Sequence, residues 1–201
     1  MTDSVALLLK ELRLPAFVRH YNPLWESAAE KGWSHPEYLA TLCEYEIADR
    51  YQRRIQKWTK EAWLPLGKTF SCLELDRFSK LNQAKVIKLQ QDIDWAHSAD
   101  NVLLMGPSGT GKTHIAAALG RALIERGVRC RLFTGVALVQ LLQQAKRDLE
   151  LMKVMTQLDK YRVIIIDDIG YVRKTDAETQ VLFEFIAHRY ESGSLIITAN
   201  Q

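Results

Sequence analysis

A glycine-rich run near the middle of the chain has the composition of a phosphate-binding loop. It satisfies the pattern GxxxxGK(S/T) at every position and follows an apolar segment. Glycines let consecutive backbone N–H groups point inward, and the dipole of a following helix adds partial positive charge at the same point. The run reads Gly106, Pro107, Ser108, Gly109, Thr110, Gly111, Lys112, Thr113. We therefore predict a site for the phosphates of ATP; the alternative is a glycine-rich turn that matches by chance.

Two side chains at the end of this loop have defined roles in such a site. Lys112 can reach the β- and γ-phosphates as a positive point charge. The hydroxyl of Thr113 is placed to coordinate Mg²⁺, which prefers oxygen ligands. Together with the loop amides, these groups predict that the chain binds ATP together with Mg²⁺.

Two carboxylates follow an apolar segment further along the chain. Residues 163–166 are Val-Ile-Ile-Ile, and Asp167 and Asp168 come directly after them. Ligands of parallel sheets collect at such strand ends. We expect Asp167 to hold the magnesium ion, commonly through water, and Asp168 to orient the attacking water and take its proton. The alternative for Asp168 is a cap on the turn before Gly170.

A third polar position follows another apolar segment near the end of the chain. Asn200 comes after residues 195–198, where a side chain can touch the γ-phosphate or the attacking water from an adjacent strand. We interpret Asn200 as a candidate sensor of the γ-phosphate. Thr198 is a weaker candidate, and the alternative for Asn200 is a solvated turn asparagine.

The segments that must position these residues alternate between strand-like and helix-like patterns. Such alternation predicts an α/β fold with a parallel sheet covered by helices on both faces. The predicted strands are 101–105, 128–133, 163–166 and 194–198. The predicted helices between them are 112–126, 137–147, 149–160 and 177–191.

Residues 1–66 have the sequence pattern of helices and not of alternating strands and helices. Apolar residues recur at helical spacing from Val5 to Leu12, a break is expected at Pro15, and Gly32 is a stop signal. A capping box at residues 34–37 begins a helix that continues to about Lys60. An extended connector at 68–78 and a helix at 82–97 follow. We predict a helical DNA-binding or partner-binding domain at 1–66 and a nucleotide-binding domain at 67–201.

A positive stripe is expected along the helix that ends near residue 60. Its basic residues recur every three or four positions with no acid among them, which places them on one helix face. They are Arg50, Arg53, Arg54, Lys57, Lys60. Double-stranded DNA is the natural partner of such a face, bound through its backbone without sequence preference. The alternative is a solvated helix face.

Bulk composition sets the remaining limits. The 201 residues are 47% hydrophobic with a net charge of +3, which permits nucleic-acid contact without demanding it. The three cysteines are far apart and lack metal-ligand spacing. The sequence contains no apolar run long enough to span a bilayer and no signal peptide. We expect a cytoplasmic protein without membrane attachment.

With these elements in order, the chain resembles the AAA+ ATPases. Among them it is similar to the IstB-type ATP-binding helper proteins of insertion-sequence transposition, which are close to the DnaC helicase loaders. The resemblance rests on residues 106–114, 166–171 and 189–200, and on the N-terminal segments 12–15, 33–39 and 46–60. It therefore covers nearly the whole chain, and it adds His114 to the expected nucleotide-binding residues.

Two features depart from the family pattern. Glutamate is usual where this chain has Asp168, although the replication initiator DnaA resembles this chain in using aspartate. The sequence also stops at Gln201, before the arginine finger, the last strand and the helical lid of AAA+ proteins, so we expect a core without its lid and impaired hydrolysis. Candidate fingers, each with the alternative of a solvated charge, are Arg173, Arg189, Arg126, Arg129 and Arg131.

The resemblance implies a three-layer P-loop core with strand order 1-4-3-2, preceded by an all-α region. It implies an ATPase that assembles as a homo-oligomer on DNA and regulates a transposase through binding ATP and releasing ADP. A replicative helicase loader, and a nucleotide-binding scaffold without turnover, are the alternatives. Lys112, Asp167, Asp168 and Asn200 are the expected catalytic residues.

Overall fold

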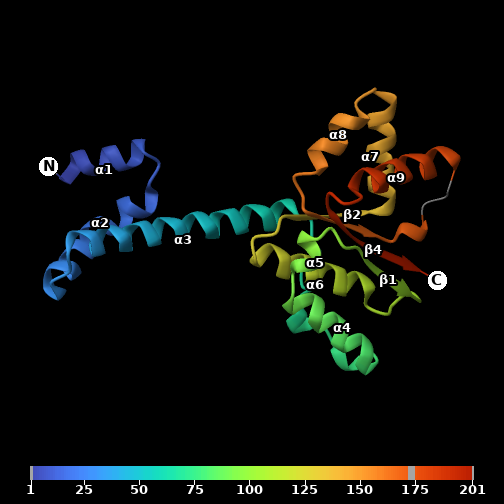
Figure 1. The fold of residues 1–201 in the computed structure, drawn as a ribbon, viewed down its shortest axis with the longest axis horizontal. Helices are drawn as coiled ribbons and strands as arrows, with labels where there is room; N and C mark the ends of the chain where they lie inside the picture. Colours follow the sequence, from blue (N-terminus) through green and yellow to red (C-terminus); the bar gives the residue numbers. More distant parts are fainter. Residues whose placement is uncertain (1, 172–174, 201) are drawn as a thin grey trace. The chain divides into compact units, whose positions relative to one another are not determined.

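The computed structural model describes residues 2–171 and 175–200. Its contacts divide the chain into two compact units, Met1–Lys57 and Trp58–Gln201. The first unit is helical, whereas the second contains a sheet with helices on both faces (Figure 1). The expected all-α region and α/β region are therefore both present.

The helices of the first unit begin and end at the predicted signals. They are α1 (Thr2–Glu11), α2 (Pro15–Lys31) and α3 (His35–Glu61), and α3 continues past Lys57. Gly32 closes α2 in a left-handed conformation, with a φ of 66°. The capping box of α3 is formed reciprocally, because Ser34 N donates to Glu37 Oε2 at 2.7 Å and Glu37 N donates to Ser34 Oγ at 3.4 Å.

A buried carboxylate joins α2 and α3 inside the first unit. Glu46 is 4% exposed, and its Oε2 accepts a hydrogen bond from the backbone N–H of Ala16 at 2.8 Å. The N-terminus of α2 is thereby satisfied by a side chain of α3. The second carboxylate oxygen, Oε1, accepts from Arg50 Nε at 2.8 Å. This pairing compensates the burial of the charge.

The segment between α3 and the sheet differs from two expectations. Residues 68–78, expected to be extended, contain the 3-10 turns η1 (Phe70–Cys72) and η2 (Leu75–Arg77). The single helix expected at 82–97 is instead two, α4 (Lys80–Gln91) and α5 (Asp94–His97). Asp92 causes the break, since its backbone is extended and its carboxylate accepts from Asp94 N at 2.9 Å, which starts the next turn.

The described residues form one sheet of four parallel strands. These are β1 (Val102–Gly106), β2 (Cys130–Thr134), β3 (Val163–Asp167) and β4 (Ser194–Asn200). Their order is β1-β4-β3-β2, which confirms the expected 1-4-3-2 arrangement. The register pairs Gly106 with Asn200 and Thr134 with Asp167, so the carboxyl ends of all four strands meet at one edge.

Helices cover both faces of this sheet. On one face α6 (Lys112–Glu125) contacts all four strands; on the other lie α7 (Gly135–Arg147), α8 (Leu151–Leu158) and α9 (Asp176–Arg189) (Figure 1). Gly120 lets α6 approach the sheet closely, because a Cβ there would lie 2.8 Å from Ile165 Cδ1. The layers fix the start of α6 against the strand ends.

The second unit includes residues that precede the expected domain boundary near residue 66. Leu132 N of β2 donates to Ala62 O at 2.8 Å, so Ala62 lies along the outer edge of this strand. Arg121 of α6 donates to Leu64 O, Pro65 O and Lys68 O. These bonds attach residues 62–68 to the second unit, which agrees with the division at Lys57 and Trp58.

Within residues 2–171 and 175–200, every helix is too short or too polar to cross a bilayer.

Candidate nucleotide-binding site

The glycine-rich loop connects β1 to α6 and has the backbone that its glycines predict. Gly106, Gly109 and Gly111 have φ values of 151°, 80° and 84°, a region that L side chains rarely adopt. Gly111 is the N-cap of α6, so the loop ends at a helix N-terminus. The free amides of that first turn and the helix dipole favour an anion at this point.

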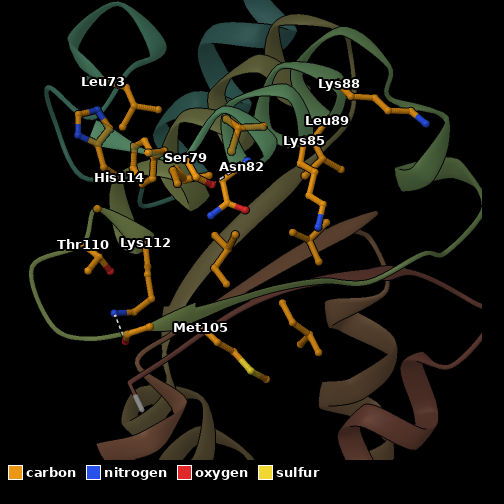
Figure 2. A pocket seen from close by; sticks show the side chains of 18 of the residues that line it. Leu73, Ser79, Asn82, Lys85, Lys88, Leu89, Met105, Thr110, Lys112 and His114 are labelled. Carbon is orange, nitrogen blue, oxygen red and sulfur yellow. Dashed lines mark hydrogen bonds between the residues drawn. The ribbon is translucent and has the colours of Figure 1, made fainter. Parts of the chain in front are cut away.

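Lys112 lies over the loop rather than in solvent. It is 8% exposed, and its Nζ donates to the carbonyl oxygens of Gly106 at 2.9 Å and Pro107 at 2.8 Å (Figure 2). The Thr110 hydroxyl also donates to Pro107 O, at 2.8 Å, and closes the loop from its other side. The ammonium group is therefore held beside the loop backbone at the start of α6, where a bound phosphate would meet it together with the free amides of the first helical turn.

The hydroxyl of Thr113 and the carboxylate of Asp167 are brought together from residues 54 positions apart. Thr113 Oγ1 donates to Asp167 Oδ1 at 2.9 Å. The same carboxylate oxygen accepts a second hydrogen bond, at 2.7 Å, from the hydroxyl of Thr198 on β4. The two predicted metal-binding groups are thus adjacent, and the hydroxyl of Thr198 is hydrogen-bonded to one of them, Asp167.

Asp168 and Asn200 form a second polar pair at the same edge. Asn200 Nδ2 donates to Asp168 Oδ1 at 2.9 Å. The backbone of Asp168 is left-handed, with a φ of 58°, and its N–H donates to Thr198 Oγ1 at 2.8 Å. The carboxylate of Asp168 consequently points across to β4, and not along its own turn.

A cavity of about 1230 Å³ adjoins the loop. It is lined by the loop, by β1 and by α4, and Figure 2 shows Asn82 and Lys85 on the side opposite Lys112 and Met105. Phe78 forms the contact between the connector and the loop, since a Cβ on Gly111 would lie 3.2 Å from its ring. The volume exceeds that of a typical drug-sized ligand site.

His114, which the resemblance added to the site, has its imidazole turned away from the loop. Its Nε2 lies 2.8 Å from the carbonyl oxygen of Thr69. Because a carbonyl can only accept, the imidazole must carry its proton on Nε2. The side chain therefore anchors the connector to α6.

The candidate finger arginines that the structure describes are held within the chain. Arg189 is 2% exposed and donates to the carbonyl oxygens of Tyr161 and Arg162 at 3.0 and 2.9 Å. Burial lowers the pKa of this guanidinium from its ordinary value. Such a group cannot reach a neighbouring subunit, so Arg189 is excluded as a finger.

The other candidate arginines have partners of their own. Arg126 donates to Gln91 O at 2.7 Å, and Arg129 pairs with Glu61 at 2.5 Å. Arg131 donates to the Tyr161 hydroxyl at 3.1 Å. Arg173 lies outside the described residues.

The basic residues of α3 are partly engaged in ion pairs. Arg50 and Arg53 both contact Glu46, and Arg53 also pairs with Asp49. The guanidinium of Arg54 lies 5.3 Å from the centroid of the Tyr51 ring. All five predicted positions on α3 are exposed to solvent, so their basic side chains lie at the surface of the helix.

The residues at this edge fit a magnesium–nucleotide complex. Thr113 and Asp167 supply a hydroxyl and a carboxylate, the oxygen ligands that Mg²⁺ prefers, 2.9 Å apart. The loop offers amides and one ammonium group to phosphate, and its interior has no side chain at Gly106, where a Cβ would lie 3.5 Å from Thr110 Oγ1. The fold and this site define a P-loop nucleotide-binding protein of the AAA+ class.

Comparison with known proteins identifies the family within this class to which the chain belongs. The model of the IstB-like ATP-binding protein family matches residues 7–201. A putative insertion sequence ATP-binding protein of Sinorhizobium fredii is 42% identical over 197 residues, which are 98% of this chain and 66% of that protein. The putative ATP-binding protein of insertion sequence IS21 from Pseudomonas aeruginosa is 32% identical, over 98% of this chain and 74% of the relative. The chain belongs to the IstB-like ATP-binding protein family.

Solved structures agree with the fold. The DnaC helicase loader matches with a TM-score of 0.52 and 24% identity, over 63% of this chain and 76% of that chain. DnaA from Aquifex aeolicus in complex with AMPPCP matches with a TM-score of 0.57 and 16% identity, over 69% of this chain and 44% of that chain. These similarities are to the AAA+ core, and the chain spans 66% of the length of its S. fredii relative.

Proposed function

We propose that this chain is an ATP-dependent, DNA-binding helper protein of DNA transposition, which assembles on DNA and regulates a transposase by binding and hydrolysing ATP. Membership of the IstB-like family and the insertion-sequence names of the relatives support the association with transposition. The observation that carries the proposal is the meeting of Thr113, Asp167, Asp168 and Asn200 beside the loop.

In the proposed site the loop amides and Lys112 bind the phosphates of ATP. Thr113 and Asp167 hold the magnesium ion, which when bound neutralises charge on the phosphate oxygens. Asp168 orients the attacking water and accepts its proton on a carboxylate oxygen. Asn200 holds that carboxylate in place through its 2.9 Å hydrogen bond and presents its remaining amide groups to the water or the phosphate.

The exposed basic residues of α3 supply the proposed DNA contacts. Arg50, Arg53, Arg54, Lys57 and Lys60 fall at helical spacing along α3 and are all exposed. Contacts of this kind neutralise backbone phosphates and carry no sequence information. They suit a protein that coats DNA, with ATP held between adjacent subunits so that nucleotide binding favours assembly.

The enzymatic part is tested by measuring phosphate release from Mg²⁺–ATP with and without duplex DNA of unrelated sequences. We expect release that DNA stimulates irrespective of its sequence. A chain that binds ATP and releases no phosphate under either condition would instead be a scaffold. Pull-down with the transposase of the same insertion element, and separately with a replicative helicase, distinguishes the transposition role from helicase loading.

DNA binding is tested with two triple variants of identical charge change. Arg54, Lys57 and Lys60 are replaced by alanine in one; Arg147, Lys153 and Lys160, which are also exposed, are replaced in the control. We expect the α3 variant to lower the slope of log affinity against log salt by about 2 to 3, since each lost phosphate contact removes about 0.9. Equal slopes in the two variants would refute the assignment of α3.

A further inference from the structure

The hydroxyl of Thr198 connects the two carboxylate residues of the site. The residue lies on β4 and is 0% exposed. Its Oγ1 donates to Asp167 Oδ1 at 2.7 Å and accepts the backbone N–H of Asp168 at 2.8 Å. A hydroxyl has one donor and two acceptor positions, so its single proton is committed to Asp167. One buried atom thus contacts the side chain of one aspartate and the backbone of the next.

We propose that Thr198 is a positioning residue that sets the magnesium-binding orientation of Asp167 and the direction of Asp168 together. The proposal deepens the proposed function, on which it rests, by assigning a residue outside the expected ligand set. In this role Thr198 would bind neither the nucleotide nor the ion. It acts through the two aspartates and the strand that carries Asn200.

The effect on Asp167 follows from which of its oxygens is engaged. Oδ1 accepts hydrogen bonds from both Thr113 and Thr198, which fixes the rotation of the carboxylate. The described residues donate no hydrogen bond to Oδ2, which leaves this oxygen to face the ion or its water. Thr113 Oγ1 acts only as a donor toward Asp167, so its oxygen lone pairs remain available to coordinate the ion. Without Thr198 the carboxylate would lose half of the bonds that orient it.

The effect on Asp168 follows from its backbone. A left-handed conformation is unfavourable for residues other than glycine, although aspartate and asparagine adopt it more readily than the others. The hydrogen bond from Asp168 N to Thr198 stabilises this conformation, with the φ of 58°. The left-handed turn directs the carboxylate toward Asn200. The same threonine therefore supports the residue that would take the proton from water.

The test compares Thr198→Val with Thr198→Ser in the full chain. Valine keeps the shape and removes the hydroxyl, whereas serine keeps the hydroxyl. The readout is the affinity for a fluorescent ATP analogue, measured in Mg²⁺ and again in EDTA. Loss of a group that orients a metal ligand lowers metal affinity by about 10- to 100-fold. We expect the affinity of Thr198→Val for the analogue in Mg²⁺ to fall at least about tenfold. Its affinity in EDTA should equal that of the wild type. Thr198→Ser should have the wild-type affinity under both conditions.

The same strand offers a matched control. Ser194, at the other end of β4, is also 0% exposed, and its hydroxyl donates to Trp95 O at 3.2 Å. Ser194→Ala removes a buried hydroxyl without touching the site, so its Mg²⁺-dependent affinity should match that of the wild type. Urea unfolding identifies any variant that does not fold. Should valine prevent folding, Thr198→Cys makes the same comparison, because a thiol is a weak donor.

Each outcome decides the proposal. It is overturned if Thr198→Val keeps the wild-type ratio of affinities in Mg²⁺ and EDTA, or if both affinities fall equally, as a purely structural role requires. If the wild type binds the analogue equally well in Mg²⁺ and in EDTA, the proposal for Thr198 is overturned as well, whereas the proposed nucleotide binding stands. A wild-type chain with no saturable binding removes the proposed function itself.

Discussion

Asn200 Nδ2 and Asp168 Oδ1 are joined by a hydrogen bond of 2.9 Å that crosses from β4 to the end of β3. The register that pairs Gly106 with Asn200 places this bond at the same strand edge as the phosphate-binding loop. This hydrogen bond fixes the direction of the Asp168 carboxylate and leaves its other oxygen lone pairs available to the attacking water. In the proposed site Asp168 contacts that water, whereas other residues bind the phosphates. Hydrolysis should therefore depend on Asp168 more strongly than nucleotide binding does.

Replacement of Asp168 by asparagine tests this difference. Asparagine tolerates the left-handed backbone at this position, so the φ of 58° is retained and only the proton acceptor is lost. We expect phosphate release to fall about 10²- to 10⁴-fold while ATP affinity changes little. Single-turnover hydrolysis and equilibrium titration separate the two quantities. A variant that hydrolyses ATP at the wild-type rate would show that Asp168 is not the base.

Gly111 of the loop and Gly67, which lies outside it, give a paired prediction. Gly111 and Gly67 have φ values of 84° and 73°, so alanine strains the backbone at either position by roughly 1–2 kcal/mol. Only at Gly111 would the new Cβ meet a neighbour, the ring of Phe78 at 3.2 Å. We expect Gly111→Ala to abolish nucleotide binding and Gly67→Ala to preserve it at a similar loss of stability. Equal affinities, measured by isothermal titration, would contradict the role of the loop.

Arg189 is predicted to matter for stability. Its guanidinium is buried and supplies hydrogen bonds to two backbone carbonyls and a contact with Asp159, at 3.4 Å. Arg189→Met leaves the carbonyl of Tyr161 without its side-chain donor and the carbonyl of Arg162 with only the backbone N–H of Ser194, at 3.0 Å. The replacement should lower the free energy of unfolding by about 3 kcal/mol. Exposed Arg147, replaced in the same way, should change it by less than about 0.5 kcal/mol. Urea unfolding midpoints of the two variants provide the check, and similar midpoints would argue against the packing role.

Glu46 gives the first unit a defined dependence on pH. Burial acts to raise its pKa, but hydrogen bonds from Arg50 and from Ala16 N, together with the charge of Arg50, hold the pKa below its ordinary value. Its contribution to stability is therefore complete above the unfolded pKa of about 4.3 and is lost as pH falls through the lower folded pKa.

The matching experiment compares wild type with Glu46→Gln by urea unfolding at a series of pH values. The difference in free energy of unfolding should be constant near neutral pH and shrink below about pH 4. Exposed Glu44, changed to glutamine, should give little difference at any pH. A difference that grew on acidification would have the wrong sign for this carboxylate.

Much of the site could be predicted because its signals are local in sequence. The glycines and Lys112 are identified by their spacing, and Asp167 and Asp168 by the strand they follow. The order of the strands followed from the family resemblance, and the structure confirms it. The connector and the break at Asp92 were missed, since weak periodicity does not distinguish turns from extended chain.

Other features required tertiary information. The sequence marks Thr198 only as a weaker sensor candidate, and its contacts with Asp167 and Asp168 come from β4 lying directly beside β3. The burial of Arg189 contradicts the usual exposure of arginine, and it depends on the carbonyls of Tyr161 and Arg162. Glu46 and Asp49, the acids that pair with Arg50 and Arg53, precede the basic run, so the run alone did not reveal these ion pairs.

The most direct test of the account is the affinity of the full chain for a fluorescent ATP analogue in Mg²⁺, measured beside Lys112→Ala. Lys153→Ala is the control, because Lys153 is exposed and pairs only with Glu150 among the described residues, at 2.7 Å. We predict saturable binding by the wild type and by Lys153→Ala, and its loss in Lys112→Ala. Undiminished binding by Lys112→Ala, or no saturable binding by the wild type, would contradict the central claim that this loop holds the phosphates.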